Sequence, residues 1–259
     1  MKAPRLMVLA APGLYGARDY WPLLKHLGAA PQTATLEELR SGKTKLMSFA
    51  GLVIPGGASY EDVVGAGQIL AGSMRFWVEE IRRFIAHGRA VLAVGNGFQA
   101  LVKCGILPVF SSATPTAGFA PNDSGCFEAR WVHVRLNTQS HSPFFEGLPE
   151  MMELPVFHRE GKLVLKSPKH LEEIKKNKSI AMQYVSDDGK LAGYPANPNG
   201  SIFNVAALSN PQGNCLGLMP HPERFTSVYH HPNWTRQTFR KPNVGLELIR
   251  KVVEYAARA

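Results

Sequence analysis

The chain has 259 residues, of which 45% are hydrophobic and 19% charged, and its formal net charge is +9. This composition excludes a disordered, collagen-like or coiled-coil chain and supplies enough apolar residues for a sizeable core. No apolar run is long enough for a transmembrane helix, so a membrane partner is not expected. The apolar run at residues 6–11 is too short for a signal peptide and predicts a buried strand.

The cysteines indicate the redox state of the protein's compartment, and the basic residues indicate which partners it could bind. Cys104, Cys126 and Cys215 are odd in number and far apart, which argues against a disulfide framework and zinc spacing and favours a reducing compartment. We therefore expect a cytoplasmic protein with no bound metal. Three lysines at 175–178 follow two glutamates in a helical-looking stretch, which is typical of a solvated helix face rather than a nucleic-acid site. Attraction for phosphorylated metabolites or an acidic protein partner stays open.

Strand and helix signals alternate through the first hundred residues. Short apolar runs are stopped by Pro-Gly turns, and from residue 68 to 87 apolar side chains recur every three or four positions. The predicted strands are residues 6–10, 52–54 and 90–94, and the predicted helices are residues 19–27, 68–87 and 95–104. This alternation predicts an α/β fold with a mainly parallel, doubly wound sheet flanked by helices.

The second half of the chain is richer in strand signals. Residues 108–200 contain many Pro, Gly, Ser and Asn, and residues 210–213 form a hairpin-type turn. The predicted strands are residues 130–136, 162–165, 180–184, 202–208 and 215–219, and residues 244–259 are a predicted amphipathic helix. Because there is no repeat and no low-complexity linker, we expect a single domain over residues 1–259.

The turn after residues 90–94 has two interpretations. Gly95, Gly97 and Ala100 match the spacing of a dinucleotide-binding fingerprint, but residues 111–119 lack the acidic residue that such a site needs. The second interpretation is a nucleophile elbow, a strained turn from strand to helix that requires small flanking residues. Downstream, His221 and Glu223 follow another apolar strand and could act as a base and its orienting carboxylate.

Four motifs in order carry a resemblance to a known family: residues 55–62 (PGGASYED), 96–99 (NGFQ), 158–161 (HREG) and 221–224 (HPER). Over nearly its whole length the chain resembles the glutaminase-subunit family of phosphoribosylformylglycinamidine synthase, PurQ. The resemblance implies a class I glutamine amidotransferase-like, flavodoxin-like fold. It also implies hydrolysis of glutamine to glutamate and ammonia for formylglycinamidine ribonucleotide synthesis, in de novo purine biosynthesis.

The resemblance assigns roles to six positions. The family's nucleophilic cysteine falls at Gly95, His221 would activate the thiol, and Glu223 would orient the histidine. Backbone N–H groups of Gly57 and Asn96 would form the oxyanion hole. Gln99 would help to hold glutamine. The implied partners are the synthetase subunit and its small accessory subunit; ATP and magnesium would belong to the synthetase, and no cofactor is expected in this chain.

Gly95 removes the nucleophile. Cys104 lies nine residues further along the same predicted helix, roughly 13 Å away at about 1.5 Å per residue, and cannot replace it. Loss of such a nucleophile costs on the order of 10⁶ in turnover, so we predict a glutaminase-inactive chain. The alternative is a non-catalytic partner or amide-binding module derived from this family.

Further departures from the family pattern occur at Ala58, Glu61, Gly65 and Arg159, and they favour a degenerate homologue over a single engineered change. Whether Gly95 itself is native stays open.

Several single residues have simpler interpretations. His158 is expected in a loop, bonded to backbone, and Asp62 is expected to cap a turn. Trp77 and Trp131 are predicted core residues. His230 and His231 lack the partners of a metal site.

Overall fold

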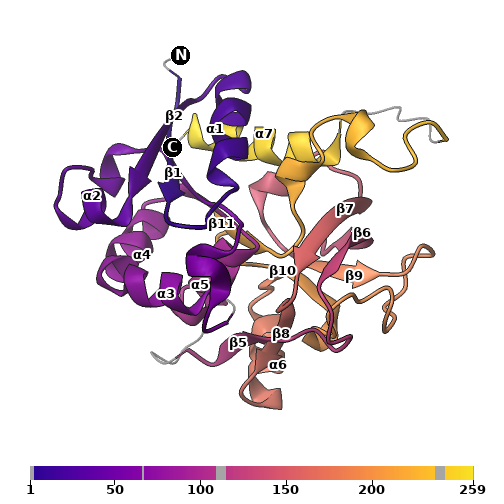
Figure 1. The fold of residues 1–259 in the computed structure, drawn as a ribbon. Coiled ribbons are helices and arrows are strands. Elements are labelled where there is room, and N and C mark those ends of the chain that lie inside the picture. Colours follow the sequence, from indigo (N-terminus) through magenta and orange to yellow (C-terminus); the bar gives the residue numbers. More distant parts are fainter. Residues whose placement is uncertain (1–2, 66, 109–114, 237–242, 259) are drawn as a thin grey trace.

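The computed structural model describes residues 3–65, 67–108, 115–236 and 243–258, and its centre is one nine-stranded sheet (Figure 1). Across the sheet the order is β2 (Ala30–Thr35), β1 (Arg5–Ala10), β3 (Gly51–Ile54), β4 (Ala90–Val94), β11 (Cys215–Leu218), β10 (Val205–Ser209), β9 (Ile180–Val185), β6 (Glu128–Leu136) and β7 (Met151–His158). A separate antiparallel pair joins β5 (Ala117–Ala120) to β8 (Lys162–Leu165).

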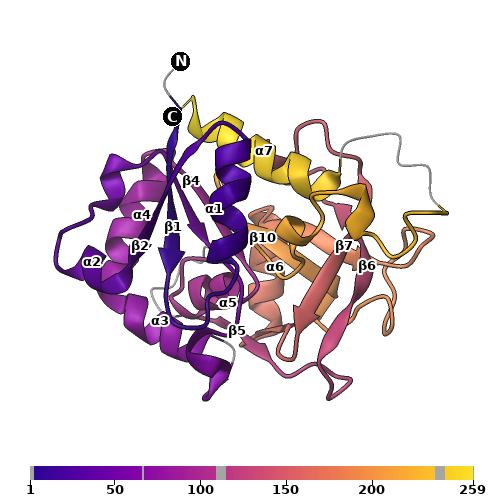
Figure 2. The same cartoon turned by 45° about the horizontal axis from the view of Figure 1, so that its top comes forward.

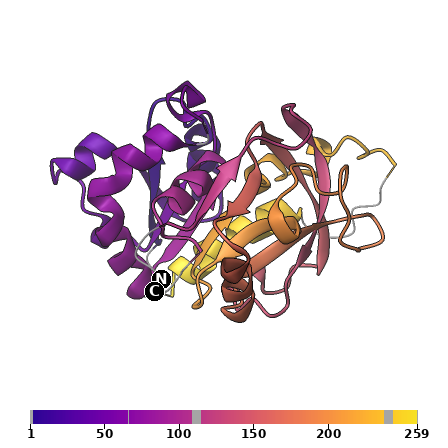
Figure 3. The same ribbon diagram turned by 90° about the horizontal axis from the view of Figure 1, so that it is seen from below.

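The sheet has a parallel half and an antiparallel half. From β2 to β11 every neighbouring pair is parallel, and from β11 to β7 every pair is antiparallel. The predicted turn at residues 210–213 does connect β10 to β11 as a hairpin. Figure 3 shows the helix-covered first half beside the strand-rich second half. The expected α/β class and the strand-rich second half are confirmed.

Helices cover both faces of the parallel half. On one face lie α1 (Ala17–His26) and α7 (Val244–Ala256), which come forward in Figure 2. On the other lie α2 (Leu36–Arg40), α3 (Gln68–Met74), α4 (Val78–Ala86) and α5 (Asn96–Lys103). Alternate side chains of β1 pack into the hydrophobic cores on opposite faces of the sheet. Leu6 and Val8 belong to the α1–α7 core, and Met7 and Leu9 belong to the opposite core. One further helix, α6 (Pro168–Lys176), contacts β8 and contains the lysine-rich stretch.

Two element predictions were wrong in their bounds. The helix expected over residues 68–87 is two helices, α3 and α4, separated by a 3-10 turn at Arg75–Trp77. The same buried stripe runs through both helices and through Trp77 in the turn between them, so apolar spacing alone cannot reveal the break. The strand expected over residues 202–208 begins only at Val205, because a 3-10 turn with Phe203 at φ 51° precedes it.

Other elements were missed. β2 is an edge strand with one buried residue in six, and β7 contains Pro155, so neither carries a strong strand pattern. Trp77 is buried as predicted, and Trp131 packs partly buried against the α1–α7 core. Within the described ranges, no helix is long and apolar enough to cross a membrane.

Candidate functional site

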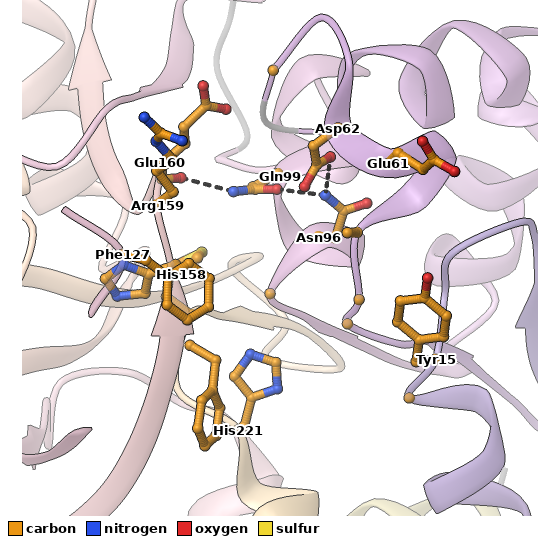
Figure 4. A pocket seen from close by; sticks show the side chains of 18 of the residues that line it. Tyr15, Glu61, Asp62, Asn96, Gln99, Phe127, His158, Arg159, Glu160 and His221 are labelled. Carbon is orange, nitrogen blue, oxygen red and sulfur yellow. Dashed lines mark hydrogen bonds between the residues drawn. The ribbon is translucent and has the colours of Figure 1, made fainter. Parts of the chain in front are cut away.

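Loops that follow four parallel strands enclose a pocket of about 660 Å³ (Figure 4). Because parallel strands end at the same edge of a sheet, residues far apart in sequence meet there. Tyr15 follows β1, Gly57 follows β3, Gly95 follows β4 and His221 follows β11. All six positions singled out by the family motifs line this pocket: Gly57, Gly95, Asn96, Gln99, His221 and Glu223.

Gly95 forms a sharp turn between β4 and α5. Its backbone has φ 51° and ψ −113°, a region that residues with a Cβ rarely adopt. Gly97 must also be glycine, since a Cβ there would lie 2.2 Å from the Ile54 carbonyl oxygen. The chain therefore has the strained strand-to-helix turn predicted for an elbow. A side chain at position 95 would point toward His221, because a Cβ on Gly95 would lie 3.0 Å from Nε2 and from Cε1 of that ring.

His221 and Glu223 form a buried hydrogen-bonded pair. The distance from Nδ1 of His221 to Oε1 of Glu223 is 2.7 Å, and the side chains are 9% and 1% exposed. Tyr20, on α1, donates to the other carboxylate oxygen, with 3.1 Å between Oη and Oε2. Burial alone would raise the pKa of Glu223, but the interaction with His221, a backbone hydrogen bond and the bond from Tyr20 together hold that pKa below its usual value.

The pairing fixes which nitrogen of His221 faces the pocket. Because Nδ1 donates to Glu223, Nε2 of the neutral ring is a hydrogen-bond acceptor. Nε2 is buried and has no hydrogen-bond partner within the described part of the chain. The ring also has an edge-on contact with Phe157, at 5.5 Å between centroids. The base expected from the motif therefore has a bound orienting carboxylate and an unpartnered nitrogen facing Gly95.

A chain of side-chain hydrogen bonds forms the opposite wall. Nδ2 of Asn96 donates to Oδ1 of Asp62 and to Oε1 of Gln99, both at 2.9 Å. Nε2 of Gln99 donates to the carbonyl oxygen of Glu160 at 2.7 Å. Figure 4 shows these bonds along one side of the pocket. Gln99, expected to hold substrate, thus has its own amide bound by the protein.

Asp62 does accept from the Gly67 N–H, as a capping residue would, but it also binds the side chain of Asn96. Burial raises the pKa of its carboxyl group.

His158 does not lie in a loop, where the sequence predicts it with its side chain bonded to backbone. It ends β7, is buried, and lines the pocket. Its Nδ1 lies 3.2 Å from Oδ1 of Asn122, and its Nε2 lies 3.4 Å from Nδ2 of Asn199. Burial, with a smaller contribution from His221, lowers the pKa of His158 to about 4. The ring is therefore neutral near pH 7.

The four residues that we expect to depart from the family motifs lie together, since Ala58, Glu61, Gly65 and Arg159 all line the pocket. A Cβ on Gly65 would lie 3.1 and 3.2 Å from the two carboxylate oxygens of Glu160.

No cysteine is among the described residues that line the pocket. Cys104 lies just past α5, its thiol donates to the Ala71 carbonyl, and burial raises its pKa to about 11. Cys215 is buried in β11, where desolvation raises its pKa, and Cys126 is exposed. Across the described ranges, no cluster of potential ligands could hold a metal ion.

Sequence reasoning gave no role in this site to Tyr20, Asn122 or Phe127, and it noted Asn199 only within residues 197–201, a segment that fits the family. Tyr20 lies 203 positions from Glu223, and Asn122 and Asn199 bind His158 from two separate loops. Phe127 lines the pocket mouth. No local pattern indicates these contacts, because each contact depends on how distant segments pack.

Comparisons with known proteins agree with this geometry. Residues 3–256 match the model of the CobB/CobQ-like glutamine amidotransferase domain. The chain is 35% identical over 258 residues to the phosphoribosylformylglycinamidine synthase subunit PurQ of Dehalococcoides mccartyi, covering 99% of both chains. It is 38% identical over 231 residues to the PurQ subunit of Archaeoglobus fulgidus, covering 85% of this chain and 81% of that one.

A solved structure is similar over the whole chain. The match is to a chain of PurLQS from Thermotoga maritima, with a TM-score of 0.72, 26% identity, and coverage of 98% of this chain and 99% of that one.

Proposed function

Because the chain belongs to the PurQ family of CobB/CobQ-like glutamine amidotransferases, we propose that it is a glutaminase-type subunit that has lost glutamine hydrolysis. In the reaction proposed for its relatives, a thiolate attacks the side-chain amide, ammonia leaves, and water hydrolyses the resulting thioester. The base, its orienting carboxylate and the elbow are all present here, but no atom at Gly95 can form that thioester.

The single observation that supports this proposal is the position of Gly95 opposite the ring of His221. The ring nitrogen that would take a thiol proton faces a residue without a side chain. Water could be polarised by His221, but the covalent route would be closed. We expect turnover reduced by on the order of 10⁶, as for other enzymes that lose a nucleophile.

The test measures glutamate released from glutamine by this chain, by His221→Ala, by Gly95→Cys, and by Gly95→Cys combined with His221→Ala. We expect no release by the unmodified chain above the His221→Ala background. His221-dependent release by the unmodified chain would refute the proposed loss. Release by Gly95→Cys alone would show that only the nucleophile is missing. If neither the unmodified chain nor Gly95→Cys releases glutamate, other residues of the pocket, such as Gly65 and Arg159, would also prevent hydrolysis.

We also propose that the chain docks on a synthetase subunit with its small accessory subunit, the partners that the family resemblance implies. The similarity to a chain of PurLQS from Thermotoga maritima supports an assembly with other subunits of the synthase. The synthetase would bind ATP and magnesium and would run on free ammonia. Co-expression with the synthetase and accessory subunits of the same organism, followed by size-exclusion chromatography, should give one complex. Separate elution at micromolar concentration would contradict this assignment.

A further inference from the structure

A second cavity, of about 540 Å³, lies between α1 and the loop that follows β11. Its volume is within the range of roughly 300–1,000 Å³ that is usual for small-molecule sites. Glu223 and Arg224 border both this cavity, which we call the α1 cleft, and the pocket described above. Neither Gly95 nor His221 is among the described residues that line the α1 cleft, so it takes no part in the chemistry proposed for the pocket.

Three side chains of the α1 cleft carry available hydrogen-bond donors. Arg18, on α1, is exposed, and its guanidinium has no hydrogen bond or ion pair with any residue that the structure describes. Arg224, on the loop, contacts Asp19 through Nη2 alone, at 2.7 Å from Oδ2, which leaves its other nitrogens available. Because the Thr226 N–H donates to Nδ1 of His230, Nε2 of the neutral His230 ring carries the hydrogen and is a donor.

We propose that the α1 cleft binds a phosphate monoester through Arg18, Arg224 and His230. The terminal oxygens of a phosphate monoester accept hydrogen bonds from several directions, and guanidinium groups bind them with paired, charge-assisted bonds. A carboxylate, with two oxygens, would satisfy fewer of these donors. The cavity is larger than a phosphate group, so its remaining volume, beside Pro22 and Leu23, would hold the organic part of the ligand.

The carboxylates that border the α1 cleft do not cancel its attraction for an anion. The charge of Asp19 is offset by Arg224, with which it forms an ion pair. The Glu223 side chain is 1% exposed, and both of its oxygens accept hydrogen bonds within the protein. The unpaired charge of Arg18 therefore faces a ligand without a neighbouring carboxylate to neutralise it.

The sequence of the loop after β11 has the same sign of charge. From Arg224 to Leu246 the chain contains four basic residues and no acidic residue, and its overall net charge is +9. A positive field of this kind raises the local concentration of anions and speeds their association. The excess of basic residues in the composition thus has a definite site at which a phosphorylated ligand would bind.

Two matched pairs of probes test the site by calorimetric titration at low salt. Glucose 6-phosphate is compared with glucose, and a short phosphoserine peptide is compared with the same peptide lacking phosphate. We expect a phosphorylated probe to bind at least about tenfold more tightly than its counterpart, because hydrogen bonds to charged groups are the strong ones. Binding of glucose 6-phosphate would identify a small metabolite as the ligand, and binding of the peptide alone would identify a phosphorylated protein segment.

Arg18→Gln is the principal variant, because it removes a cationic donor without breaking any side-chain bond in the described part of the chain. It should weaken binding of the phosphorylated probe by at least about tenfold. Arg83→Gln is the matched control at another exposed arginine, on α4 and across the sheet from α1. It should change the affinity by less than about twofold, since distant exposed charges are screened.

NMR titration locates the bound probe. The amide resonance of Thr226, whose N–H donates to His230, should shift with the phosphorylated probe, and the amides of Asn96 and Gln99 in the pocket should not. Equal affinity within both pairs of probes, no binding of any probe, equal weakening by Arg18→Gln and Arg83→Gln, or shifts confined to the pocket amides would overturn the inference. None of these outcomes depends on glutamine hydrolysis, which the glutamate assay above measures separately.

Discussion

Tyr20 and Glu223 are joined by a buried hydrogen bond of 3.1 Å between Oη and Oε2. The preceding residue of α1, Asp19, pairs in turn with the residue after Glu223, Arg224, at 2.7 Å. Two consecutive residues of one helix thus hold two consecutive residues of the loop after β11. Because the other oxygen of Glu223 accepts from His221, both carboxylate oxygens are fixed and the imidazole is fixed with them.

Tyr20→Phe tests this support while keeping the ring in the core. Removing the hydroxyl leaves a buried charged acceptor without its partner, so we expect the free energy of unfolding to fall by about 1–3 kcal/mol. Tyr255→Phe, whose ring packs on Phe144, is the matched control and should change stability by less than about 0.5 kcal/mol. Urea denaturation at neutral pH measures both. Equal effects of the two changes would show that the bond to Glu223 contributes nothing specific.

The same variant should alter the response to acid. The lowered pKa of Glu223 stabilises the fold above the unfolded-state value, and this stabilisation is lost as pH falls through the folded-state value. The Tyr20 hydrogen bond helps to lower that pKa, so without it the loss should begin at a higher pH. Acid titrations followed by circular dichroism would compare the midpoints of the two proteins. An unchanged midpoint would contradict this role.

Gly95→Ala tests whether the elbow is strained. Its φ of 51° disfavours any residue with a Cβ, and the added atom would lie 3.0 Å from the His221 ring. We expect a loss of about 1–3 kcal/mol in the free energy of unfolding. Gly72→Ala, inside α3 with nothing within 4 Å of the new atom, should instead stabilise by up to about 1 kcal/mol. Destabilisation by both changes to the same extent would remove the case for strain at Gly95.

The sequence was sufficient to predict the parallel half of the sheet, apart from its edge strand β2, and the loops that form the site. Continuous apolar runs identify β1, β3 and β4, the first two followed by Pro-Gly turns and the third by Gly95, and their common direction brings the following loops to one edge. The family motifs in those loops then identify Gly95, His221 and Glu223 as neighbours. These predictions succeeded because each depends on a local pattern and one topological rule.

The parts that could not be predicted depend on contacts between distant segments. Tyr20 lies in an ordinary amphipathic helix, and nothing nearby in sequence indicates that its hydroxyl reaches Glu223. His158 has the appearance of a loop residue because β7 contains a proline and an irregular apolar pattern. Its neutral ring follows from burial and from Asn122 and Asn199, which only the packed structure brings together.

Asn96 supports the segment that follows β3. Its side chain accepts from the Ser59 N–H and donates to Asp62, which in turn accepts from the Gly67 N–H. Tyr60, Glu61 and Asp62 all have positive φ, so this segment depends on such bonds to hold a strained backbone.

Asn96→Ala should therefore speed hydrogen exchange at the Ser59 and Gly67 amides by at least about tenfold, the equivalent of about 1.4 kcal/mol in local opening. Exchange within β4, measured in the same sample, is the internal control and should change less. Uniform acceleration of all amides would indicate global destabilisation instead.

His158 should make the protein less stable in mild acid. Burial lowers its pKa from 6.5 to about 4, so between these values the unfolded chain binds a proton that the folded chain does not. Stability therefore falls as pH decreases from about 6.5 to about 4, by roughly 3 kcal/mol in total, and His158 has no such effect at higher pH. His158→Gln should remove this part of the pH dependence, and His26→Gln, at an exposed position, should retain it. Urea denaturation of the three proteins at several pH values measures the slopes; the same slope in all three would show that His158 is not the group responsible.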